Sequence, residues 1–221
     1  MPDSFAISPR ESHVATRAFI VANIMAVVTL VAFVATSFRF DIPFGRFSND
    51  PTGDAHGYWY RSLLSNLGVA VWFASCVAAG FTSTISLCGR SRRVFFGSLA
   101  LLSAVMGLDD AFSVHEQFRP DTFSVGENAL PILYGLIVVV MAVTHIRVVR
   151  STFWLPLMVA AVSFGISRSV RIVPVDLASS VAAVASFKFV GIVNWGTYCS
   201  VEWWRSRGRP PHVARSVPSS R

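Results

Sequence analysis

Long apolar runs, separated by short polar connections, dominate the chain. The first run, residues 18–38, has about the 20 residues that an α-helix needs to cross roughly 30 Å of hydrocarbon at about 1.5 Å per residue. Five more runs follow, at residues 63–87, 94–115, 129–146, 153–166 and 177–204. The pattern predicts an all-α fold, an integral membrane bundle of about six transmembrane helices.

The first run has an alternative interpretation as a cleaved signal peptide. Ala35, Thr36 and Ser37 weakly resemble a cleavage site, but the run exceeds the roughly 7–15 apolar residues of a signal peptide. We therefore predict a retained helix. The expected organisation is a cytoplasmic tail at residues 1–17, a six-helix transmembrane domain at 18–204 and a basic, disordered cytoplasmic tail at 205–221.

Composition supports a membrane protein over a soluble one. Hydrophobic residues make up 53% of the chain and charged residues only 14%, whereas charged residues make up about a quarter of an ordinary soluble domain. The net charge of +7 comes from arginines in short clusters between apolar runs, with no continuous basic face for nucleic acid. We expect the lipid bilayer as partner and no nucleic acid, and the sequence leaves open a homo-oligomer or a membrane-complex partner.

The distribution of arginines between alternate connections predicts the orientation. With the amino terminus in the cytoplasm, twelve arginines fall on the cytoplasmic side and six on the other. Positively charged residues concentrate in short cytoplasmic loops, so this ratio predicts cytoplasmic amino and carboxyl termini. We expect a multi-pass protein of a bacterial inner membrane. The twelve are Arg10, Arg17, Arg90, Arg92, Arg93, Arg147, Arg150, Arg205, Arg207, Arg209, Arg215 and Arg221.

Candidate chemistry begins at the outer end of the third apolar run. Asp109 and Asp110 are costly in lipid, so they should face the bundle interior or water. On a helix Ser113 and Glu116 lie within about 40° of Asp109, while His115 lies about 120° away. A metal would therefore need ligands from other segments as well, and the alternative is ordinary polarity at a solvated helix end.

Glu127 opens the fourth apolar run after a short connection. Together with Ser124 it has the spacing of a capping box, which explains it as a helix start. The short connection also brings Glu127 near the preceding acids. Asp109, His115, Glu116 and Glu127 are therefore candidate ligands for a cation or divalent metal.

Lys188 is the only lysine, and it lies about 16 Å into the last predicted helix. A lysine in low dielectric can lose its proton, and a carboxylate stabilises its charged form. Asp109 or Asp110 is the expected partner, in either a static ion pair or a proton relay. Arg168 and Arg171 could neutralise the remaining acids, and we interpret Glu202, beside two tryptophans, as an interfacial charge.

Two segments carry a resemblance to a group of uncharacterised bacterial multi-pass membrane proteins. The first is the DD-x4-HE segment at residues 109–116, and the second is the FK-x-x-GI-x-x-W segment at residues 187–195. The resemblance covers the third to sixth predicted helices and implies no activity. That group leads us to expect acidic residues shortly before the lysine, where this chain has Val184 and Ala185.

Two functional hypotheses follow, beside a structural role as an accessory subunit. In the first, the protein handles protons or cations through a relay of Asp109, Asp110 and Lys188. In the second, it is a membrane enzyme of the hydrolase type, with a divalent metal as cofactor in an outward-facing site. The sequence favours the first, because one well-placed histidine is little for a transition metal.

Overall fold

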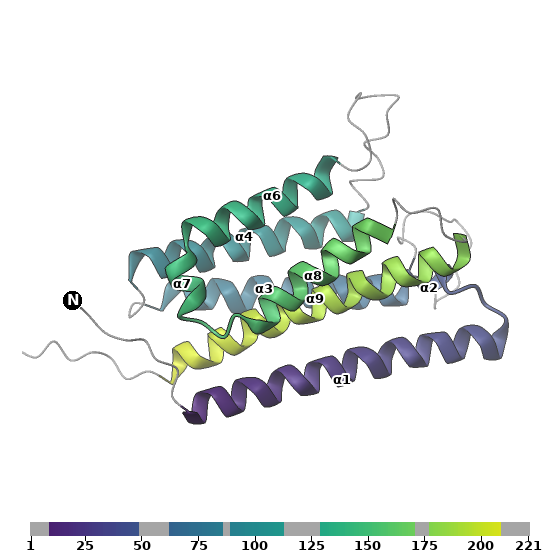
Figure 1. Cartoon of the computed structure of the whole chain (residues 1–221), viewed down its shortest axis with the longest axis horizontal. Helices are drawn as coiled ribbons and strands as arrows, with labels where there is room; N and C mark the ends of the chain where they lie inside the picture. The colour runs from purple at the N-terminus through teal and green to yellow at the C-terminus, as the bar shows by residue number, and fades with distance from the viewer. Residues whose placement is uncertain (1–8, 49–61, 86–88, 113–128, 171–176, 209–221) are drawn as a thin grey trace, which may run out of the picture.

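A computed structural model describes residues 9–48, 62–85, 89–112, 129–170 and 177–208, and every regular element in these ranges is a helix. The predicted all-α class is confirmed. Six of the described helices are longer than two turns, and each runs in the opposite direction to the one before it (Figure 1). They are α1 (Pro9–Phe40), α3 (Leu63–Thr84), α4 (Arg90–Phe112), α6 (Ala129–Thr144), α8 (Leu155–Val170) and α9 (Leu177–Arg207).

Each predicted apolar run coincides with one of these helices. The main differences are at the ends: α1 begins at Pro9, inside the predicted tail, and the fourth run stops at Thr144 before a separate short helix, α7 (Ile146–Arg150). Another short helix, α2 (Gly45–Ser48), follows α1. Alternating directions place the start of α1 and the end of α9 at one end of the bundle, which we call the termini end; the other is the far end (Figure 1).

α9 is the central helix of the bundle. It packs against α8, α3 and α1, while α3 also packs closely against α4. Trp195, Tyr198 and Cys199 of α9 join the largest buried cluster together with residues of α3, α4 and α8. α6 contributes only partly buried side chains to that cluster, so it covers the outside of α4.

α1 lies along one side of the bundle, next to α9. Asn23 of α1 and Asn194 of α9 form a reciprocal amide pair, in which each Nδ2 donates to the other's Oδ1 at 3.1 and 3.0 Å. The remaining Nδ2 hydrogens donate to backbone carbonyls one turn back, at Phe19 and Val190. Two polar side chains are thereby satisfied inside an otherwise apolar contact.

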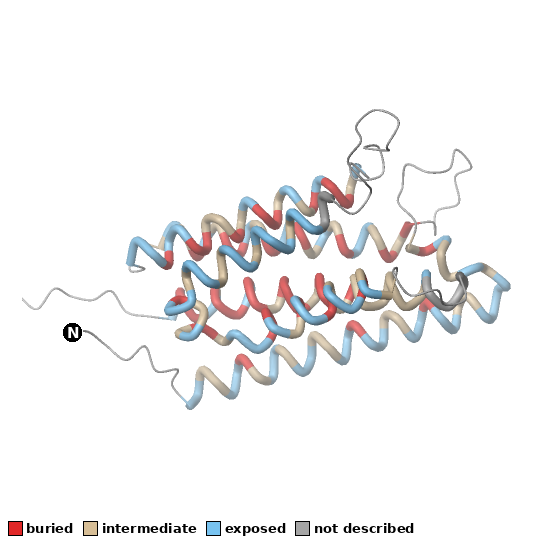
Figure 2. Tube along the Cα trace, turned by 45° about the horizontal axis from the view of Figure 1, so that its top comes forward, coloured by how far each residue is buried: buried red, intermediate tan, exposed pale blue. Residues whose placement is uncertain are grey.

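Apolar side chains cover the outside of the bundle, and many polar ones lie inside. Figure 2 shows exposed positions along the outer faces of the helices. Exposed apolar residues include Ile20, Ile24 and Val31 of α1, whereas Ser75, Ser103 and Asn194 are fully buried. Three helices, α1, α3 and α4, are long and apolar enough to cross a membrane. Exposed apolar surface of this extent suits hydrocarbon.

Close helix contact at α9 depends on glycine. A methyl group at Gly191 would lie 2.8–3.0 Å from three ring carbons of Phe164 in α8, closer than carbon atoms approach. The Phe164 ring is itself stacked on Trp72 of α3, with ring centroids 6.0 Å apart and planes 11° apart. Because Trp72 blocks its retreat, the ring cannot easily make room for a larger residue.

Gly191→Ala should therefore destabilise the protein by about 1–3 kcal/mol, the usual cost of overpacking a core. Gly165→Ala is the matched control, because a methyl group at Gly165 of α8 would meet nothing within 4 Å. We expect thermal melts in detergent to show a lower apparent midpoint for the first variant and an unchanged or higher one for the second. Equal midpoints for the two variants would contradict the packing argument.

Candidate functional site

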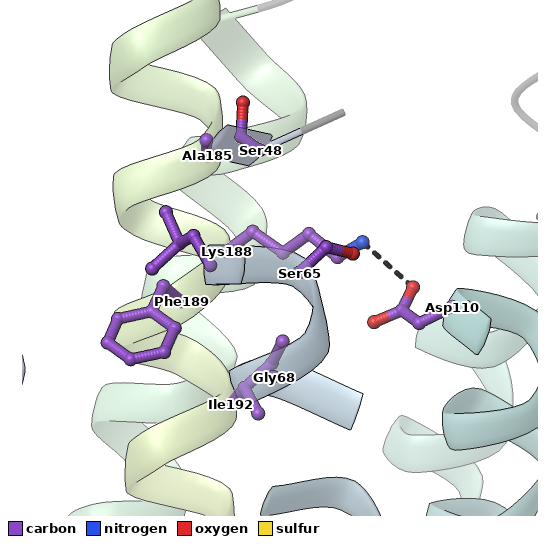
Figure 3. Close-up of a pocket in the computed structure, with 9 residues that line it drawn as sticks. Ser48, Ser65, Gly68, Asp110, Ala185, Lys188, Phe189 and Ile192 are labelled. Carbon is purple, nitrogen blue, oxygen red and sulfur yellow. Dashed lines mark hydrogen bonds and ion pairs between the residues drawn. The ribbon is translucent and has the colours of Figure 1, made fainter. Parts of the chain in front are cut away.

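An ion pair between Lys188 and Asp110 lies in the far half of the bundle. Lys188 Nζ of α9 lies 2.8 Å from Asp110 Oδ1 of α4 and donates a hydrogen bond to it. Figure 3 shows the lysine side chain crossing from α9 towards α4 to reach the carboxylate. The predicted pairing of Lys188 with one of the two aspartates is confirmed, and the partner is Asp110.

Both oxygens of Asp110 have a partner. Oδ2 accepts a hydrogen bond of 3.0 Å from the indole Nε1 of Trp72 in α3. The Asp110 side chain is only 11% exposed, whereas that of Lys188 is 35% exposed. Hydrogen bonds to an ionised carboxylate are stronger than neutral ones, so these two donors hold the carboxylate in a fixed position.

Asp109 points to a different neighbour. It is also buried, and its carboxylate lies next to the Tyr134 hydroxyl of α6. Adjacent residues of a helix point about 100° apart, so one aspartate meets α9 and the other meets α6. The pair of aspartates thus links α4 to helices on two sides.

A small cavity of about 30 Å³ adjoins the ion pair. This volume holds one or two water molecules, since one water needs at least about 10–15 Å³ of such space. Lys188 lines the cavity, and its side chain is partly exposed. The lining residues come from four helices and include both members of the pair: Ser48, Leu64, Ser65, Gly68, Asp110, Ala185, Lys188, Phe189 and Ile192 (Figure 3).

Several predicted site residues lie outside the described residues. These are His115, Glu116, Glu127 and Arg171, so their proposed meeting with Asp109 stays a prediction. Within the described ranges no group of three or more His, Cys, Asp or Glu side chains could hold a metal ion. Arg168 is half-buried at the end of α8.

The expectation that Glu202 is an interfacial charge is wrong. Its side chain is 0% exposed at the termini end, and Oε2 accepts a hydrogen bond of 2.7 Å from Arg92 Nη2 of α4. Oε1 accepts from Arg205 Nη1 and from the backbone N–H of Phe153, at 3.0 Å for the latter. A buried carboxylate needs such partners, and two arginines and a backbone donor supply them.

This second ionic cluster, formed by Arg92, Glu202 and Arg205, joins three parts of the chain. Arg205 also lies 3.8 Å from Glu11 of α1, measured from Nη2 to Oε2. The guanidinium of Arg92 stands over the Phe96 ring at 5.3 Å. Sequence reasoning missed the cluster because a glutamate beside tryptophans at a helix end is typical of an interface. Its signal was the i, i+3 spacing of Glu202 and Arg205, which allows a pair within the helix.

The comparisons with known proteins identify a family. Residues 21–201 match a domain of unknown function, DUF8692. The chain belongs to this family. No curated protein and no solved structure matches it. The DUF8692 match includes Lys188, Asp110 and Arg92, whereas Glu202 and Arg205 follow its last residue, 201.

In the structure Lys188 pairs with Asp110 and not with Asp109, and measurements of stability can test this assignment. Lys188→Met leaves Asp110 without its ammonium partner and should cost about 1–3 kcal/mol, less than the 3–5 kcal/mol of a fully buried pair because Lys188 is partly exposed. Adding Asp110→Asn should restore most of the lost stability, because the orphaned charge is removed as well.

Adding Asp109→Asn to Lys188→Met is the matched control, since Asp109 meets Tyr134 and should give no rescue. Apparent melting midpoints of the parent, the single variant and both double variants provide the comparison. Equal rescue by the two asparagine substitutions would show that the lysine does not distinguish the aspartates.

Proposed function

We propose that this DUF8692 protein is a multi-pass protein of a bacterial inner membrane that handles protons through the Lys188–Asp110 pair. The carrying observation is a lysine and an aspartate 2.8 Å apart, both lining a cavity of water size. An ammonium group can give up a proton and a carboxylate can take one, and cavity water can exchange protons with the surface. Ionisable groups within membrane bundles are by default functional candidates.

Protons fit this site better than metal cations do. Lys188 and Trp72 already occupy both oxygens of Asp110, so a metal ion would have to displace the ammonium group against its repulsion. The cavity is also too small for a hydrated cation with its shell of waters. These two features support the proton over the cation in our proposal.

The metal-dependent enzyme and the accessory subunit stay alternatives. The enzyme hypothesis depends on His115, Glu116 and Glu127, which lie outside the described residues. A homo-oligomer or a complex with another membrane protein likewise stays a prediction. The lipid bilayer is the partner that the apolar exterior supports.

We further propose six crossings with both termini in the cytoplasm. Six antiparallel helices and the excess of arginine at the termini end support this topology. α6 and α8 have 16 residues each, about 24 Å, which a bilayer accommodates by local thinning.

Reporter fusions test the topology directly. Fusions after Arg93 and Arg150 should give the cytoplasmic signal of a phosphatase and fluorescent-protein reporter pair, and a fusion after Asp121 should give the external signal. An external signal at Arg93 together with a cytoplasmic one at Asp121 would reverse the proposed orientation.

Lys188→Arg tests proton handling with the charge preserved. Guanidinium keeps its proton in proteins, so the variant should stay folded yet lose proton flux about a hundredfold or more, the usual size of a general acid–base contribution. The measurement is proton flux into liposomes that contain the purified protein and a pH-sensitive dye. Asp110→Asn should lose flux similarly, and the exposed Arg93→Lys serves as the control. Flux that survives both site substitutions would exclude the pair from the path.

A further inference from the structure

Three aromatic rings form a layer beneath the Lys188–Asp110 pair, which we call the aromatic layer: Trp72 of α3, Phe164 of α8 and Trp195 of α9. Trp72 stacks on Phe164 and meets Trp195 edge to face, with centroids 6.0 and 5.8 Å apart. Trp72 and Trp195 are 1% and 2% exposed. Such ring contacts add to the energy of burial and exclude water.

The helices pack tightly around this layer. Besides Gly191 against Phe164, a methyl group at Gly107 of α4 would lie 3.0 Å from the Cβ of Trp72. α4 and α9 thus present glycine where the rings lie, and the backbone approaches them closely. Along α9, Trp195 of the layer follows Lys188 by about two helical turns and lies on the same face of the helix.

Further polar side chains lie on the termini side of the aromatic layer. Trp195 Nε1 donates to Ser103 Oγ at 2.8 Å, and the hydroxyls of Thr152 and Tyr198 are 3.1 Å apart. Glu202 follows one turn after Tyr198, and all these hydroxyl and carboxyl side chains are 0% exposed. Two polar compartments therefore lie along α9, with Lys188 and Glu202 about 21 Å apart along the helix and the aromatic layer between them.

We infer that the aromatic layer is the gate of the proposed proton path, and that the hydrogen bond from Trp72 to Asp110 locks it. This inference rests on the proposed function. The indole of Trp72 links the aromatic layer to the ion pair, because its ring is part of the layer and its N–H donates to the Asp110 carboxylate. No other ring of the layer has a hydrogen bond to Asp110 among the described residues.

The lock responds to the charge of Asp110. When a proton moves from Lys188 Nζ to Asp110 Oδ1, an N–H bond breaks, an O–H bond forms and both groups become neutral. Trp72 then loses its charged acceptor and keeps a weaker neutral one. Asp109 beside it and Tyr134 of α6 are the other titratable groups described near Asp110. The proton's arrival thus loosens the ring that separates the two compartments.

Cys199, which is buried on the termini side of the layer, can report on the gate. Cys76 and Cys88 are replaced by alanine in the full chain, and a small membrane-impermeant thiol reagent is added outside spheroplasts. Trp72→Phe keeps a ring and removes the N–H, so labelling of Cys199 should accelerate about tenfold, the factor for one hydrogen bond to a charged group. Trp195→Phe is the matched control, since it removes an N–H that reaches only Ser103, and its rate should stay near the parent's.

Asp110→Asn is the second test, because it removes the charged acceptor without touching a ring, and it should also accelerate labelling. Gel filtration and melting establish that each variant is folded; if Trp72→Phe does not fold, Asp110→Asn carries the comparison. Parental rates in the folded variants, or equal acceleration in Trp195→Phe, would overturn the lock. Unchanged proton flux in Asp110→Asn with accelerated labelling would overturn the proposed function and leave the lock standing.

Discussion

A charge inside hydrocarbon must find its partner within the protein, and this constraint sets the arrangement of the two helices that carry both ionic sites. Lys188 and Glu202 of α9 meet Asp110 and Arg92 of α4. The pairs are 14 residues apart on α9 and 18 on α4, about 21 and 27 Å. Two contacts so far apart fix the antiparallel direction and the register of α4 against α9. The long side chain of Arg92 spans the difference between the two spacings. Loss of one member of either pair leaves a charge that lipid cannot solvate.

The helices themselves could be predicted from hydropathy because that signal is local. The hydropathy of a run of about 20 apolar residues does not depend on which helix packs against it. The six runs therefore coincide with six helices to within a few residues at most ends. The start of α1 at Pro9 differs more, because Glu11, His13 and Arg17 lower the hydropathy without interrupting the helix. Which helices touch depends on side-chain pairing across the whole chain, and hydropathy holds no information on it.

The candidate site was predictable only in part for the same reason. A lone lysine within an apolar run required a carboxylate at similar depth, which limited the choice to Asp109 and Asp110. Which of the two aspartates faces Lys188 depends on the rotation of α4 about its own axis, and no pattern in the sequence predicts that rotation. The sequence did not single out Trp72, because tryptophan contributes to the hydropathy as an apolar residue although its indole N–H is a hydrogen-bond donor. Glu202 was misread because its arginine partner lies 110 residues earlier in the chain.

The amide pair between Asn23 and Asn194 has a consequence for biosynthesis. α1 precedes the other described helices in the chain, and its amide partner lies on α9, which follows them. Until α9 is inserted, Asn23 has only the backbone carbonyl of Phe19 and whatever water reaches it. The amide pair can therefore form only after the helices between α1 and α9 have been synthesised. Docking of α1 through this pair therefore comes late in assembly, and a chain truncated before α9 cannot complete it.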